Sequence, residues 1–85
     1  MLNNFMITGI VESFDYDAKL LHVLINKGTE DESRIPILTE NIPYPNDFEK
    51  NKFVIISGYL APSIIYSKVI AIAKQIVIKS NAWEE

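Results

Sequence analysis

The sequence contains no cysteine and few glycines, and both shortages limit what the chain can be. Without cysteine, disulfides and thiolate metal sites are excluded, and the single histidine, His22, cannot build a zinc site unless several carboxylates lie beside it. Two of the three glycines, Gly9 and Gly58, stand inside runs typical of strands. Because glycine weakens a strand interior, its presence there indicates a bulge, a sharp bend or a close backbone contact.

Basic charge and long apolar runs are also scarce. Eight Lys and Arg residues stand against eleven Asp and Glu residues, giving a net charge of −3, which argues against a nucleic-acid binder with an extended basic surface. The N-terminus has no basic leader, and no window approaches the stretch of about 18 apolar residues that spans a bilayer. We therefore expect a cytoplasmic protein without membrane contact.

The chain is rich in isoleucine and valine, which favour strands. Hydrophobic residues make up 48 % of 85 residues, which suits one small β-rich domain. We assign residues 1–80 to this domain and residues 81–85 to a short C-terminal tail, whose Trp83 we expect to dock on its own domain or on a neighbour.

Apolar segments separated by turn residues predict five strands. DYDAK joins the first two strands in a hairpin, and KGTEDES leads to the third, whose Pro36 suits an edge or a bulge. A long connection follows, in which PNDFEK could form one helical turn capped by Asn46, and APSIIYS joins the last two strands. The expected strands cover residues 4–14, 20–26, 34–38, 52–60 and 68–79.

This order of elements indicates an all-β fold, the OB-fold. Three strands, one long connection and two further strands are the plan of the partly open five-stranded Greek-key barrel that binds oligonucleotides and oligosaccharides. Gly9 and Gly58 would lie where the first and fourth strands bend around this barrel.

Four segments carry a family resemblance: NNFMITGIV, SRIPIL, KFVIISGYL and SKVIAIAKQIVIK. They resemble the first, third, fourth and closing strands of the bacterial single-stranded DNA-binding proteins and of their relative, primosomal replication protein N. The last segment is similar to the latter protein down to Ser67, Lys68 and the pair Gln75 and Ile76. The resemblance implies a homo-oligomer, with Arg34 at a basic position and Lys68 on a lysine of the DNA-binding hairpin.

Sorting each strand into its two faces predicts a core and a second apolar surface. A lone small barrel cannot bury both faces, so we expect a dimer or tetramer with the first-strand region in the interface. In the fourth strand the expected core set is Val54, Ile56, Gly58 and Leu60, opposite Phe53, Ile55, Ser57 and Tyr59. In the fifth, Val69, Ala71, Ala73 and Val77 oppose Ile70, Ile72, Ile76 and Ile78.

Single-stranded nucleic acid is held by aromatic side chains that stack on bases and by basic groups along the phosphates. Tyr66 and Lys68, at the end of the last connection, are the leading candidates. The same lysines could instead protect sheet edges, and the strand aromatics could pack against a partner subunit. The further candidates are Phe53, Tyr59, Arg34, Lys74, Lys52 and Lys27.

The sequence offers no pattern typical of an enzyme. The acidic residues cluster in turns, and no P-loop, dinucleotide fingerprint or metal motif is present, so neither catalysis nor a cofactor is expected. His22 lies in an apolar alternation and suits an interface or surface position better than a catalytic one.

We therefore predict a single-stranded DNA-binding protein of low sequence specificity that acts in DNA replication, recombination or repair, with replication proteins as further candidate partners. The alternative is an OB-fold protein-interaction or assembly subunit that has lost nucleic-acid binding, which the acidic balance supports. An OB-fold that recognises structured RNA is a third hypothesis, less favoured because the chain has no dense basic surface.

Overall fold

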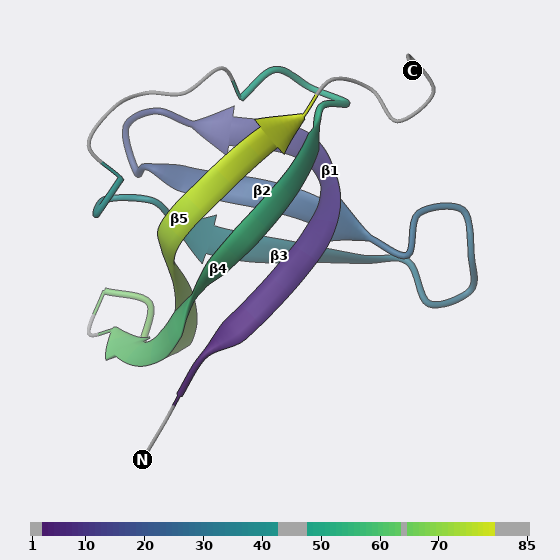
Figure 1. Ribbon diagram of the computed structural model, residues 1–85. Coiled ribbons are helices and arrows are strands. Elements are labelled where there is room, and N and C mark those ends of the chain that lie inside the picture. The colour runs from purple at the N-terminus through teal and green to yellow at the C-terminus, as the bar shows by residue number, and fades with distance from the viewer. Residues whose placement is uncertain (1–2, 43–47, 64, 80–85) are drawn as a thin grey trace.

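The computed structural model describes residues 3–42, 48–63 and 65–79, which form one closed barrel (Figure 1). The order of strands around the barrel is β1-β2-β3-β5-β4, and β4 closes the barrel by pairing with β1. All pairs are antiparallel except β3 with β5. The five-stranded Greek-key barrel predicted from the sequence is confirmed. The strands are β1 (Phe5–Asp15), β2 (Leu20–Ile25), β3 (Ser33–Leu38), β4 (Phe53–Ser63) and β5 (Lys68–Lys79).

The largest departure from the expected strand bounds is at the end of β4. This strand continues to Ser63, which pairs with Lys68 at the start of β5. Residues 59–63 and 68–72 thus pair with each other and are here called the β4–β5 arm, whose tip curves away from the barrel (Figure 1), whereas its base stays in the barrel because Ala71 and Ile72 also pair with the end of β3. The APSIIYS connection is therefore shorter than expected, because its first three residues belong to β4.

The connection between β3 and β4 shows no helix in its described part. Residues 48–51 contain no helical turn, and the Lys52 N–H closes a tight turn by donating to the Glu49 carbonyl at 3.2 Å. Asn46, the expected cap, lies outside the described residues. No helix in the described ranges is long and apolar enough to cross a membrane.

The core is built from alternate residues of the strands and one loop residue. Phe48 is 7 % exposed, and its ring centroid lies 4.7 Å from that of Phe14. The sequence analysis did not place Phe48 in the core because it stands in a polar loop. The fully buried side chains of large volume are Leu21, Ile37, Ile56, Val11, Val23 and Val54.

A β-bulge in β5 changes which of its side chains face the core. Gly58 pairs with Ala73, whereas the preceding Ser57 pairs with Gln75, so Lys74 is the extra residue. Ala71 and Ala73, which precede the bulge, belong to the core. Ile76 and Ile78, which follow the bulge, pack against the core. The strict alternation expected for this strand was wrong, because one extra residue exchanges the two faces.

Val77 and Leu60 are exposed, although the sequence pattern grouped Val77 with Ala71 and Ala73 and placed Leu60 in the core. Val77, grouped with Ala71 and Ala73 by strict alternation, is 39 % exposed because the bulge turns it outward. Leu60 is 45 % exposed because β4 pairs with β1 only as far as Gly58, so that no β1 strand lies beside Leu60.

Gly9 and Gly58 stand where strands approach one another too closely for a side chain. A Cβ atom on Gly58 would overlap the carbonyl oxygen of Ile72, and one on Gly9 would lie 2.5 Å from the carbonyl oxygen of Leu24. The close backbone contacts expected at both glycines are confirmed. They allow β1 and β4 to curve around the barrel.

We expect Gly58→Ala to lower the free energy of unfolding by about 2–3 kcal/mol, because a backbone oxygen cannot move aside as a flexible side chain can. Urea denaturation followed by circular dichroism measures this. Gly28→Asn is the control: Gly28 has a φ of 86° that asparagine tolerates, and no atom lies within 4 Å of a Cβ there. Its effect should stay below about 0.5 kcal/mol. Equal stability of Gly58→Ala and the wild type would contradict the close contact.

Candidate nucleic-acid interface

The eight residues predicted from the sequence do not converge on one surface of the chain. The β2–β3 turn and the tip of the β4–β5 arm project from opposite sides of the barrel (Figure 1). The residues occupy the β2–β3 turn and the start of β3 (Lys27, Arg34), the start of β4 (Lys52, Phe53), the β5 bulge (Lys74) and the arm with its turn (Tyr59, Tyr66, Lys68).

The arm brings together two tyrosines and a lysine. Tyr59 and Ser63 share one face of β4 because they are four positions apart, and Ser63 pairs with Lys68. Tyr66 lies beside them in the turn, where its N–H donates to the Ser63 Oγ at 3.3 Å. Lys68 is exposed and both tyrosines are half-buried. This face offers aromatic surface next to a cation.

The loop that follows β3 links the arm to the β1–β2 turn. Asn41 Nδ2 donates to the Tyr59 hydroxyl at 3.4 Å, and the Thr39 N–H donates to the Lys19 carbonyl at 2.8 Å. Lys19 is exposed, and the same turn carries Tyr16, which is 66 % exposed. We call this set the arm surface: Tyr16, Lys19, Asn41, Tyr59, Tyr66 and Lys68.

Tyr16 and Lys19 were not predicted from the sequence. The aspartates of DYDAK indicate a turn, and Asp15 indeed accepts hydrogen bonds from the N–H groups of Asp17 and Ala18, each at 3.0 Å. The signal that could have found them is an aromatic and a basic residue within a loop that OB-folds use for binding.

The β2–β3 end of the barrel is a poor cationic surface. Arg34 Nη1 donates to Glu12 Oε1 at 3.1 Å, so a carboxylate offsets its charge. Lys27 is followed in the same turn by the acidic run Glu30, Asp31 and Glu32. The two basic candidates at this end therefore contribute little net positive potential.

His22 lies on the outer side of β2, opposite Ser13 on β1 and Pro36 on β3. It is half-buried, and its Nδ1 atom is buried without a hydrogen-bond partner among the described residues. β3 pairs with β5 only at its last two residues, so Pro36 lies beyond that ladder, at the edge position expected for it. In the part of the chain that the structure describes, no cluster of three or more His, Asp or Glu residues is placed to hold a metal ion.

The outer face of β1, β4 and β5 is mostly apolar. Met6 is 73 % exposed, and Phe53 and Ile55 are half-buried. The sequence candidate Phe53 therefore belongs to this face, away from the arm surface. The register aligns Ile10 with Phe53 and Lys79, Thr8 with Ile55 and Val77, and Met6 with Ser57 and Gln75.

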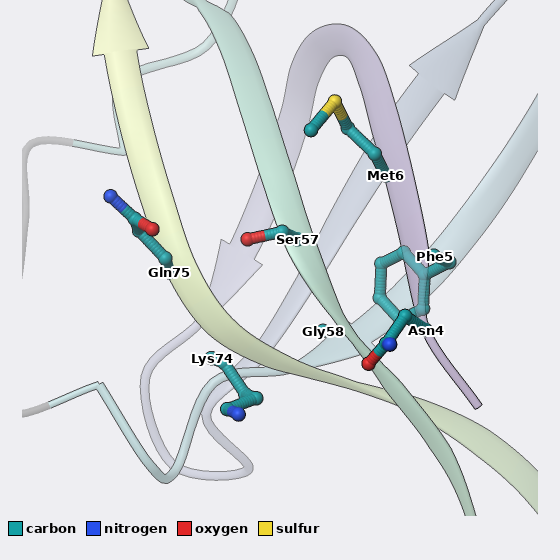
Figure 2. Close-up of a pocket in the computed structure, with 7 residues that line it drawn as sticks. All are labelled: Asn4, Phe5, Met6, Ser57, Gly58, Lys74 and Gln75. Atoms are coloured by element: carbon teal, nitrogen blue, oxygen red, sulfur yellow. The ribbon is translucent and has the colours of Figure 1, made fainter. Parts of the chain in front are cut away.

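One end of this face is hollowed. The hollow is open, has a volume of about 580 Å³, and lies beside the start of β1, near the place where β4 and β5 cross at Gly58 (Figure 2). Lys74, a candidate from the sequence, is exposed at its wall. The lining residues are Asn4, Phe5, Met6, Ser57, Gly58, Lys74 and Gln75.

Solved structures that resemble the chain share its whole fold. The N-terminal domain of PriB from Thermoanaerobacter tencongensis, solved as a dimer, has a TM-score of 0.73 and 18 % identity over 93 % of this chain and 98 % of that one. The mitochondrial single-stranded DNA-binding protein Rim1 of S. cerevisiae, in one crystal form, has a TM-score of 0.69 and 14 % identity over 96 % of this chain and 98 % of that one. A second crystal form of Rim1 has a TM-score of 0.70 and 15 % identity over 96 % of this chain and 99 % of that one.

No protein-family model matches the chain, and no curated protein matches its sequence. At identities of 14–18 % the similarity of the solved structures establishes the fold alone. The resemblance to single-stranded DNA-binding proteins and primosomal replication protein N, predicted from short sequence segments, is confirmed at that level: the chain has the OB-fold of PriB and Rim1.

Proposed function

We propose that this chain binds single-stranded DNA with low sequence specificity. The observation that carries the proposal is the arm surface, which comprises three tyrosines and two lysines on the β1–β2 turn and on the β4–β5 arm with its turn. OB-folds hold oligonucleotides with these two loops. Rim1, a single-stranded DNA-binding protein, matches the fold over 96 % of the chain, which supports the proposal.

Stacking on tyrosine supplies most of the affinity in this proposal. Each stacked base contributes about 1–3 kcal/mol, whatever its identity, because every base has a π-face. Few phosphates are neutralised, because Lys19 and Lys68 are the basic residues of the arm surface and Asp17 and Glu40 are exposed beside it. The affinity should therefore be modest and its salt dependence shallow. The logarithm of the binding constant should fall with the logarithm of the salt concentration with a slope of about 0.7 for each phosphate contacted.

We further propose a role in DNA replication, recombination or repair, with replication proteins as partners and a cytoplasmic location. The proposed activity needs no cofactor and no catalytic group, since stacking and phosphate contacts suffice. The alternative, an assembly subunit without nucleic-acid binding, is less well supported, because the matched protein Rim1 is a single-stranded DNA binder.

We also propose that the chain forms a homo-oligomer through the outer face of β1, β4 and β5. The centre of the proposed interface is the row Thr8, Ile55 and Val77, and the hollow with Met6 lies beyond it, at one end of the face. Contiguous exposed apolar surface of this kind commonly marks a protein interface. The similar PriB domain is dimeric, which supports the proposal.

We expect the protein to bind a labelled oligo-dT of about 30 nucleotides and to bind duplex DNA far more weakly. Lys68→Ala should weaken binding about fivefold at low salt, as expected for one exposed charge contact of ~1 kcal/mol, and should reduce the salt slope by about 0.7. Fluorescence anisotropy at two salt concentrations measures both quantities.

Lys27→Ala is the matched control, because Lys27 is an exposed lysine on the opposite side of the barrel. It removes the same charge and should change the affinity less than twofold. Equal losses for the two variants would show only a general effect of net charge. No binding at micromolar protein in low salt would refute single-strand binding.

We expect light scattering to give a dimer or tetramer for the wild type and the monomer mass of 9.7 kDa for Thr8→Arg. Thr8 is exposed on the outer face, so an arginine there leaves the barrel core intact and places a charge in the proposed interface. Ser13→Arg, at an exposed site on the same strand, should leave the oligomer unchanged. A monomeric wild type would contradict the proposed interface.

A further inference from the structure

We propose that the hollow between β1, β4 and β5 binds one nucleotide, with its phosphate at Lys74 and its base between Met6 and the side-chain amides of Asn4 and Gln75. This site is separate from the arm surface. The inference that a strand of DNA supplies the nucleotide rests on the proposed function, whereas the site itself could equally accept a free nucleotide.

The bulge in β5 gives the hollow its polar wall. In a regular strand, neighbouring side chains point to opposite faces, so Lys74 and Gln75 would separate. Because Lys74 is the extra residue of the bulge, both it and Gln75 line the hollow (Figure 2). Gly58 contributes only backbone, which leaves room beside them. Bulges commonly direct a side chain towards a binding site in this way.

The polar side chains of the hollow have no hydrogen-bond partners among the described residues. Asn4, Ser57, Lys74 and Gln75 supply an amide, a hydroxyl, an ammonium and a second amide, and none of these side chains bonds to another described residue. None of the described residues that line the hollow is acidic, although the chain carries eleven acidic residues. The described wall therefore has a net charge of +1 and several free donors and acceptors, a combination suited to an anionic ligand with polar edges.

The chemistry of the wall selects a nucleotide over simpler ligands. An ammonium group donates to phosphate, and side-chain amides both donate to and accept from the edge of a base. The Met6 thioether is adaptable apolar surface that packs well against an aromatic ring, and it is 73 % exposed. Inorganic phosphate would leave the amides and Met6 unused, and an apolar ligand would leave Lys74 unused.

The dimensions agree with such a ligand. β1 and β5 pair with opposite edges of β4, so two strand spacings, roughly 10 Å, separate Met6 from Gln75. The volume of about 580 Å³ lies within the range of about 300–1,000 Å³ typical of small-molecule sites. The hollow is open to solvent on one side, which would let a strand enter and leave.

The test is an NMR titration of the full chain with thymidine monophosphate and, separately, with oligo-dT. We expect both to shift the side-chain amide signals of Asn4 and Gln75 and the methyl signal of Met6. Lys74→Ala should weaken binding of the monophosphate about tenfold, the loss typical of one charge-assisted hydrogen bond. Lys79→Ala, an exposed lysine of the same strand outside the hollow, should leave it unchanged.

The outcomes separate this site from the arm surface. If oligo-dT alone shifts the hollow signals, the hollow holds a unit of the strand; if the monophosphate also shifts them, it accepts a free nucleotide. If oligo-dT binds and is sensitive to Lys68→Ala while the hollow signals do not move, the proposed function stands and the nucleotide site is refuted. Binding of the monophosphate that Lys74→Ala does not weaken would also refute it.

Discussion

The close crossing of β4 and β5 at Gly58 is the constraint on which the rest of the structure depends. The backbone of Ile72 occupies the space that a side chain on Gly58 would need, and the bulge at Lys74 follows directly in β5. Bulge and glycine together bend both strands and increase their twist, which closes a barrel in so short a chain. They also exchange the two faces of β5, so that Ile76 and Ile78 continue the contribution of Ala71 and Ala73 to the core.

The same crossing positions both proposed sites. On one side of it, β4 and β5 continue as the arm, whose face carries Tyr59 and Lys68. On the other side, the bulge places Lys74 and Gln75 at the wall of the hollow. Charge is distributed accordingly: the described wall of the hollow has no acidic residue, whereas Arg34 is paired with Glu12 and Lys27 stands in an acidic turn. An acidic chain can therefore hold DNA by local surfaces, without an overall basic charge.

Much of the fold could be predicted because apolar alternation and turn residues are local signals. All five strands, the single long connection and the close contacts at Gly9 and Gly58 follow from them. The predictions that failed concern features that are set by the pairing between strands. The extra residue Lys74 reverses the face of every later residue in β5, and the sequence of this strand alone does not indicate the bulge. Leu60 was misplaced for a related reason, since the length of the arm is set by its partner strand.

The site was less predictable than the fold. Tyr59, Tyr66 and Lys68 all belong to the arm and its turn, whereas Lys27 lies in the β2–β3 turn and Arg34 near the start of β3, at the other end of the barrel (Figure 1). The sequence shows which residue types are present but not which of them share a surface. Tyr16 and Lys19 join the arm surface only through the loop after β3, by the contacts of Thr39 and Asn41. A tertiary connection of this kind leaves no trace in the spacing of residues along the chain.

The most direct test of the account is to map oligo-dT on the full chain by NMR, following backbone amide signals as the strand is added. The account predicts that the strongest shifts fall on the β1–β2 turn and the β4–β5 arm, around Tyr16, Tyr59 and Lys68, while the β2–β3 turn around Lys27 stays unaffected. Shifts concentrated at the β2–β3 turn, or none at all at saturating strand, would contradict it.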